Sequence, residues 1–91
     1  MANEVIAKKL HVNGIVQGVG FRPFVFQLAE KHELKGEVAN TSSGVLIHVE
    51  GQAAQIAAFE KDLAAKPPPL AYIVEITGQP KPVKNHAGFA P

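Results

Sequence analysis

Residues 14–22 of this chain read Gly-Ile-Val-Gln-Gly-Val-Gly-Phe-Arg, and they stand where an alternating strand pattern changes to a helical one. Three glycines allow backbone N–H groups to converge where a Cβ atom would clash. The start of a helix adds unpaired N–H groups and the positive end of its dipole. Arg22 adds a permanent charge with a two-pronged donor geometry. The stretch therefore predicts a cradle for an anion such as a phosphate or a carboxylate.

The residues before this loop predict a strand, and the residues after it predict a helix. Leu10 and Val12 alternate with Lys9 and His11, so residues 4–13 are expected to form a half-buried strand. After the loop the period changes, and one helical face gathers Phe21, Val25, Leu28, Ala29 and His32. Pro23 is expected in the first helical turn, and Gly36 is expected to end the helix.

A hairpin and a second helix are predicted next. Residues 37–41 and 45–50 have strand character and are separated by Thr41-Ser42-Ser43-Gly44, a sequence typical of a tight turn. On the second strand Val45, Ile47 and Val49 are expected to face one way. A second helix is indicated by apolar residues at spacings of three and four: Ile56, Phe59 and Leu63.

The region after the triple proline at 67–69 predicts one further strand. Residues 70–77 are rich in β-forming side chains, and we expect a buried strand there. Residues 79–85 contain two prolines and are poor strand material. The order is then β-α-β-β-α-β, which is the ferredoxin-like α+β arrangement of an antiparallel sheet with two helices on one face. With 91 residues, the chain 1–91 is expected to form one domain.

The run Val16–Val25, reading Val-Gln-Gly-Val-Gly-Phe-Arg-Pro-Phe-Val, resembles the signature of the acylphosphatase family. It is similar in particular to the acylphosphatase-like domain that opens the HypF carbamoyltransferases of nickel–iron hydrogenase maturation. The resemblance extends over nearly the whole chain and includes Asn40, which follows Arg22 by 18 positions. It is weaker at the end, where Gly-Phe-Ala-Pro at 88–91 predicts at most a short last strand.

The resemblance implies roles for individual residues. The residues expected to bind the substrate phosphoryl group are Gln17, Gly18, Val19, Gly20, Phe21 and Arg22. Asn40 is expected to hold the attacking water, so that Arg22 and Asn40 are the catalytic residues. No cofactor is implied, because phosphoryl transfer depends mainly on positioning and on stabilisation of charge.

The resemblance also implies a substrate and partners. Hydrolysis of a small acyl phosphate is expected, with carbamoyl phosphate as the substrate and hydrogenase maturation as the setting. This chain would then be the N-terminal module of a larger carbamoyltransferase, and its partners would be the later domains and other hydrogenase maturation proteins. A monomeric chain is expected.

Each residue also has a simpler interpretation. The glycines can serve a purely steric turn, Arg22 can be a surface ion-pair partner, and Asn40 can introduce the hairpin as a turn residue. A function of another class also stays open, namely a module that binds phosphate or carbamoyl phosphate without turning it over.

Composition excludes several other functions. The net charge of +1 and the lack of a block of like charge argue against a nucleic-acid partner. No apolar run approaches the roughly 20 residues that span a bilayer, and a cytoplasmic protein is expected. There is no cysteine, which removes thiolate chemistry.

No metal site is expected either. The histidines lack metal-ligand spacing and are expected to be surface or half-buried residues: His11, His32, His48 and His86. The acidic residues, Glu50 among them, occur singly and are expected on solvated faces.

Overall fold

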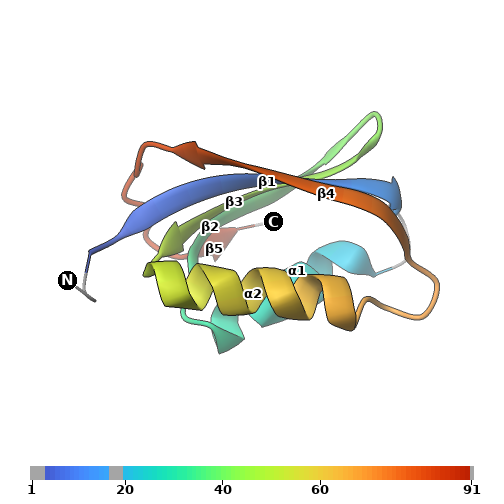
Figure 1. Ribbon diagram of the computed structural model, residues 1–91, viewed down its shortest axis with the longest axis horizontal. Coiled ribbons are helices and arrows are strands. Elements are labelled where there is room, and N and C mark those ends of the chain that lie inside the picture. Colours follow the sequence, from blue (N-terminus) through green and yellow to red (C-terminus); the bar gives the residue numbers. More distant parts are fainter. Residues whose placement is uncertain (1–3, 17–19, 91) are drawn as a thin grey trace.

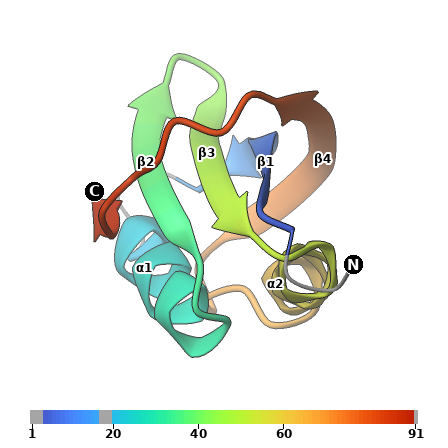
Figure 2. The ribbon, with the colours of Figure 1, turned by 90° about the vertical axis from the view of Figure 1, so that its left-hand side faces the viewer.

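The computed structural model describes residues 4–16 and 20–90, which form a sheet with both described helices on one face (Figures 1 and 2). The elements are β1 (Ile6–Ile15), α1 (Phe21–Lys31), β2 (Lys35–Thr41), β3 (Gly44–Gly51), α2 (Ala53–Ala65), β4 (Tyr72–Lys81) and β5 (Phe89–Ala90). The strand order is β4-β1-β3-β2-β5. The first four strands pair antiparallel, and the short β5 runs parallel to β2. The predicted ferredoxin-like arrangement is confirmed.

The core lies between the sheet and the helices, and β3 supplies its centre. Val45, Ile47 and Val49 are fully buried, so the predicted common face of this strand is confirmed. Both helices cover that face with their apolar residues, which are Phe21, Val25, Leu28 and Ala29 from α1, and Ile56, Phe59 and Leu63 from α2. Each large apolar side chain buried in this way stabilises the fold by about 1.5–3 kcal/mol.

The predicted end of the first helix was wrong. Helix α1 stops at Lys31, and Glu33 takes the positive φ of 58° that reverses the chain. The N–H of Leu34 donates to the carbonyl of Ala29 at 2.8 Å, which closes the last turn. Gly36 lies within β2 instead, with φ of 141°, where the backbone of β3 leaves no room for a side chain.

The strand predicted at 70–77 is present as β4, but its predicted burial was wrong. Among the described strands, β4 lies at the edge of the sheet and pairs only with β1. Tyr72 and Val74 are each 65% exposed, while Ile73 and Ile76 pack partly against the core. The strand runs further than expected, through Pro80 to Lys81. A proline is tolerated there because an edge strand has one side without ladder hydrogen bonds.

From the end of β4 the chain crosses the sheet face that the helices leave uncovered. Figure 2 shows this segment, residues 82–88, passing from β4 towards β2 at the opposite side of the sheet. The carbonyl of Gly88 accepts a hydrogen bond from the N–H of Gly36 at 2.9 Å, and Phe89 then pairs with Gly36. The ring of Phe89 meets Phe26 of α1 edge to face, with centroids 6.0 Å apart. The last strand is short, as its sequence predicted.

Gly36 provides a test of this packing. A Cβ atom at Gly36 would stand 1.8 Å from the carbonyl oxygen of His48, in a backbone conformation that L side chains rarely adopt. We expect Gly36→Ala to lower the free energy of unfolding by about 2–4 kcal/mol in urea denaturation. Gly88→Ala is the control, because a Cβ there would meet nothing within 4 Å. Equal effects of the two substitutions would contradict the assigned packing of Gly36.

Asp62 ties the two helices together and predicts a pH dependence. Its carboxylate accepts a hydrogen bond from Lys31 Nζ at 3.2 Å and lies 2.9 Å from His32 Nε2. The contact with His32, followed by that with Lys31, lowers the pKa of Asp62 below its ordinary 3.8. The ionised carboxylate therefore favours the folded state above about pH 3.8, and this contribution is lost as the pH falls through the lowered pKa.

We expect Asp62→Asn to lower the melting temperature at neutral pH by a few degrees and to flatten its fall in acid. Thermal unfolding between about pH 7 and about pH 2 measures both effects. Glu75→Gln, which removes an exposed carboxylate from β4, is the control. An acid profile of Asp62→Asn that parallels the native profile would refute the role of this contact.

Candidate functional site

The candidate site begins where β1 leaves the sheet. The pairing of β1 with β4 shifts register between Asn13 and Gly14. Gly14 has φ of 145°, and a Cβ atom there would stand 2.1 Å from the carbonyl oxygen of Tyr72. Such an irregularity bends a strand and redirects the chain that follows it. Val16 is then buried in the core, which fixes the point at which the loop begins.

The loop ends at Gly20, which is the N-cap of α1. Gly20 has φ of 78° and ψ of 18°, a left-handed conformation, and no side chain of residues 4–16 or 20–90 caps the helix start. The first helical bond joins the N–H of Phe24 to the carbonyl of Gly20 at 3.2 Å. Pro23 lies in the first turn, as predicted. An uncapped helix start leaves backbone N–H groups available for an anion.

Phe21 and Arg22 are neighbours at the helix start, but Phe21 is buried in the core and Arg22 is exposed to solvent. The side chain of Phe21 is 1% exposed and packs in the core, with its ring centroid 5.6 Å from that of Phe24. It fixes the helix start, and only its backbone can face a ligand. Arg22 is exposed and lines a cavity of about 540 Å³ with Pro23, Phe26 and Gln27.

Asn40 lies at the same end of the sheet as this helix start. It is exposed, next to last in β2, and its partner in β3 is Val45, which pairs in turn with Val12 of β1. Figure 1 shows the β2–β3 hairpin, the end of β1 and the start of α1 on one side of the molecule. A second cavity of about 260 Å³ separates the end of β1 from the hairpin residues 42–44.

Of the predicted site residues, the structure therefore brings Gly20, Phe21, Arg22 and Asn40 to one end of the sheet. The predicted phosphate-binding residues Gln17, Gly18 and Val19 lie outside the described residues. Asn40 lies in strand β2, paired with Val45, and not in the hairpin turn, which consists of residues 42 and 43. Its exposed position in the strand leaves its side chain amide accessible to a ligand.

A cluster of three polar residues lies at the other end of the sheet, namely His48, Glu50 and His86. The sequence predicted the histidines to be surface or half-buried residues and the glutamate to be solvated. His48 is 5% exposed and Glu50 is 3% exposed, so the predictions of a surface or half-buried histidine and a solvated carboxylate were wrong. His48 Nε2 lies 2.9 Å from Glu50 Oε2. The His86 ring stands over that of His48, with centroids 5.2 Å apart. Residues 82–88 cover this face, which explains the burial.

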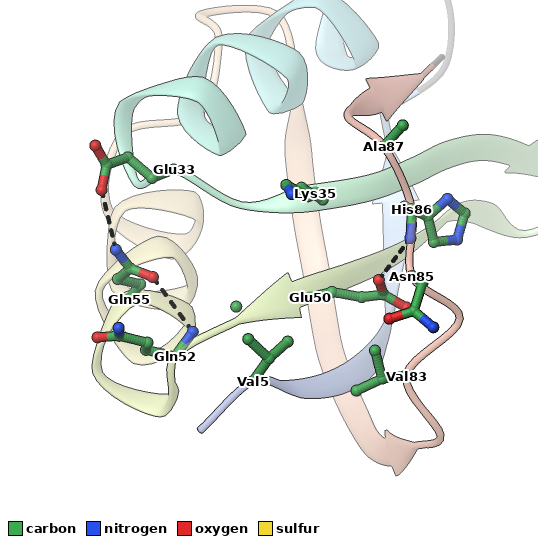
Figure 3. A pocket seen from close by; sticks show the side chains of 11 residues that line it. Val5, Glu33, Lys35, Glu50, Gln52, Gln55, Val83, Asn85, His86 and Ala87 are labelled. Atoms are coloured by element: carbon green, nitrogen blue, oxygen red, sulfur yellow. Dashed lines mark hydrogen bonds between the residues drawn. The ribbon is translucent and has the colours of Figure 1, made fainter. Parts of the chain in front are cut away.

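The Glu50 carboxylate is held by the backbone of the crossing segment. It accepts hydrogen bonds from the N–H groups of Lys84 and His86, the latter at 3.0 Å (Figure 3). Burial by itself raises the pKa of Glu50. The hydrogen bond with His48 lowers it, and the two backbone N–H groups and the attraction of His86 lower it further, from 4.5 to about 2. Glu50 therefore carries its charge in the interior.

The sequence pattern could have predicted that two of the three cluster residues lie together. His48 and Glu50 alternate with the apolar residues of β3, so they share the face opposite the core. Histidine and glutamate two positions apart on a strand are neighbours on one face. His86 lies in an irregular segment without a period, and nothing in the sequence places it over that face.

Comparison of the sequence with known proteins identifies its family. The acylphosphatase family profile matches residues 8–91. The chain belongs to the acylphosphatase family. Acylphosphatase from Thermotoga maritima is 37% identical over 84 residues, which are 91% of this chain and 92% of that protein. The resemblance that residues 16–25 carry is thus confirmed.

The chain is also similar to a small part of much larger proteins. The probable carbamoyltransferase HypF of Methanocaldococcus jannaschii is 51% identical over 65 residues, which are 71% of this chain and 8% of that protein. A crystal structure of full-length HypF in the phosphate- and nucleotide-bound form superposes with a TM-score of 0.95 at 44% identity, over 99% of this chain and 12% of that one. The chain thus spans about a tenth of the first carbamoyltransferases that it matches.

Free-standing acylphosphatases share the fold over their whole length. The acylphosphatase of Bacillus subtilis superposes with a TM-score of 0.86 at 29% identity, over 96% of this chain and 97% of that protein. Within residues 4–16 and 20–90, neither helix has the length and apolar character needed to cross a membrane.

Proposed function

We propose that this chain hydrolyses small acyl phosphates. The phosphoryl group is bound by residues 17–22, and Asn40 orients the water. One observation carries the proposal, namely the left-handed Gly20 and the exposed Arg22 at an uncapped helix start, at the same end of the sheet as Asn40. In this proposal, backbone donors, a fixed positive charge and a neutral polar side chain act on the same substrate.

The chemistry suits these groups. The water oxygen bonds to phosphorus while the bond between phosphorus and the acyl oxygen breaks, and the carboxylate leaves with the bonding electrons. The proton of the water goes to an oxygen of the substrate phosphate. An acyl phosphate is an activated mixed anhydride, so the protein needs mainly to position the reactants and to stabilise charge on the equatorial oxygens.

Arg22 and Asn40 have different tasks in this reaction. The Arg22 guanidinium can donate two parallel hydrogen bonds to phosphate oxygens, a geometry that lysine cannot reproduce. Asn40 is uncharged, so it can hold the water through its amide group without serving as a base. Phe21 supports both by fixing the helix start in the core, where it is 1% exposed.

Carbamoyl phosphate is the proposed substrate, and a larger carbamoyltransferase of hydrogenase maturation is the proposed setting. The support is the degree of similarity, which is 51% to a protein named as a probable HypF carbamoyltransferase and 37% to one named as an acylphosphatase. In this setting the partners are the later domains of the same chain and other maturation proteins.

Release of phosphate from carbamoyl phosphate and acetyl phosphate tests the proposal. We expect Arg22→Ala to reduce kcat/KM by about 10²–10³-fold, because it removes a donor to the charge that develops in the transition state. Arg22→Lys should recover only part of this loss. Asn40→Ala should lower kcat by a similar factor and leave phosphate affinity nearly unchanged. Lys61→Ala, which removes an exposed charge from α2, should leave turnover unchanged.

The same experiment separates an enzyme from a binding module. Phosphate binding without turnover in the native chain would overturn hydrolysis and leave a module that holds its substrate. Turnover that survives both alanine substitutions would overturn the assigned residues. Circular dichroism of each variant excludes loss of fold as the cause, and a higher kcat/KM for acetyl phosphate would contradict the proposed substrate.

A further inference from the structure

The cluster of His48, Glu50 and His86 lies far from the candidate catalytic end and takes no part in the proposed hydrolysis. Residues 44 and 51 are the two ends of β3, so Glu50 stands near the end of β3 opposite the hairpin and Asn40. One ring nitrogen of each histidine and a carboxylate oxygen of Glu50 all lie within 4.8 Å of one another. This is a set of three convergent ligand atoms from two separate segments of the chain.

His86 contributes a polar atom that the protein itself leaves unused. Its Nε2 is buried and has no hydrogen-bond partner among the described residues. A buried nitrogen without a partner costs free energy, and such atoms in native proteins commonly indicate a ligand or water. In this cluster the unused nitrogen belongs to the residue that completes a ligand set.

The carboxylate of Glu50 is already oriented for such a ligand. Its two oxygens accept the backbone N–H groups of Lys84 and His86, contacts that do not depend on any side chain of those residues. Backbone hydrogen bonds of this kind hold ligating carboxylates in known metal sites. Only the contact between His48 Nε2 and Glu50 Oε2, at 2.9 Å, would be replaced by bonds to an ion.

We propose that His48, Glu50 and His86 bind a divalent transition-metal ion of the zinc class. Two imidazoles and one carboxylate are a donor set that Zn²⁺ uses with a fourth position left for water. Mg²⁺ and Ca²⁺ prefer oxygen ligands, so two histidines disfavour them. A tetrahedral site places its ligand atoms roughly 3.4 Å apart, so the three atoms, which lie within 4.8 Å of one another, need to move together only slightly to bind one ion.

The cluster lies beside a cavity at this end of the sheet. Glu50 and His86 also line a cavity of about 580 Å³, together with Val83, Asn85 and the start of α2 (Figure 3). Because His86 belongs to the crossing segment and His48 to β3, the bound ion joins residues 82–88 to the sheet and favours the folded state.

Calorimetric titration of the chelator-treated chain with ZnCl₂ tests the site. We expect one ion per chain, a melting temperature that rises with Zn²⁺ concentration, and no response to Mg²⁺. His86→Ala should weaken binding by about 100-fold or more and abolish the rise. This variant keeps the backbone hydrogen bond from residue 86 to Glu50. His11→Ala is the matched control, because His11 lies in β1, where its ring contacts Ser43 Oγ of the hairpin and not the cluster.

Two further measurements make the test independent of variant folding. In the native chain, Zn²⁺ should shift the imidazole ¹⁵N resonances of His48 and His86 and leave those of His11 and His32 in place. Co²⁺ should give visible absorption of a nitrogen and oxygen site, since the chain has no cysteine. No heat and no rise in melting temperature with Zn²⁺, or binding by His86→Ala equal to that of the native chain, would overturn the proposal.

Discussion

The structure depends on the burial of one face of β3 beneath two helices. Val45, Ile47 and Val49 are fully buried there, and β3 is paired on both sides, with β1 and with β2. A slip of one residue in either pairing would turn these side chains out of the core, so the register is strongly fixed. That register in turn sets the end of β1, the hairpin and Asn40 at one end of the sheet. The position of the candidate catalytic residues is thus a consequence of apolar packing.

The same alternation creates the second chemical feature of the molecule. Because the valines and the isoleucine of β3 point to the helices, His48 and Glu50 must point to the other face. A charged carboxylate that is 3% exposed is tolerable only when its oxygens are hydrogen-bonded, and the crossing segment supplies two backbone N–H groups. The route of residues 82–88 over this face and the ionisation of Glu50 therefore support each other.

Strict periodicity made most of the fold predictable. The alternation in β1 and β3 and the helical spacing of Phe21, Val25 and Leu28 predicted the correct elements. The errors lay where tertiary context decides. Gly36 was predicted to end the first helix, but the residue with positive φ that reverses the chain after the helix is Glu33. The apolar residues of β4 predicted a buried strand, but their position at the edge of the sheet leaves them exposed or only partly buried. An edge strand also tolerates Pro80.

The candidate phosphate site can be predicted from the sequence, whereas the cluster of His48, Glu50 and His86 cannot. The reason is the sequence separation between the residues that form each site. The phosphate-binding loop is predicted to act largely through its own backbone, so a contiguous motif describes it. The cluster joins His48 to His86 across 38 positions through a segment with no period, and only the fold brings them together. Strand β2 runs from the end of the sheet near the cluster to the end that carries Asn40. Strand β5, which follows the crossing segment, pairs with β2 at Gly36 and Glu37, away from Asn40. Asn40 is held by β3 and the hairpin, so changes in the crossing segment should reach the candidate catalytic end only weakly.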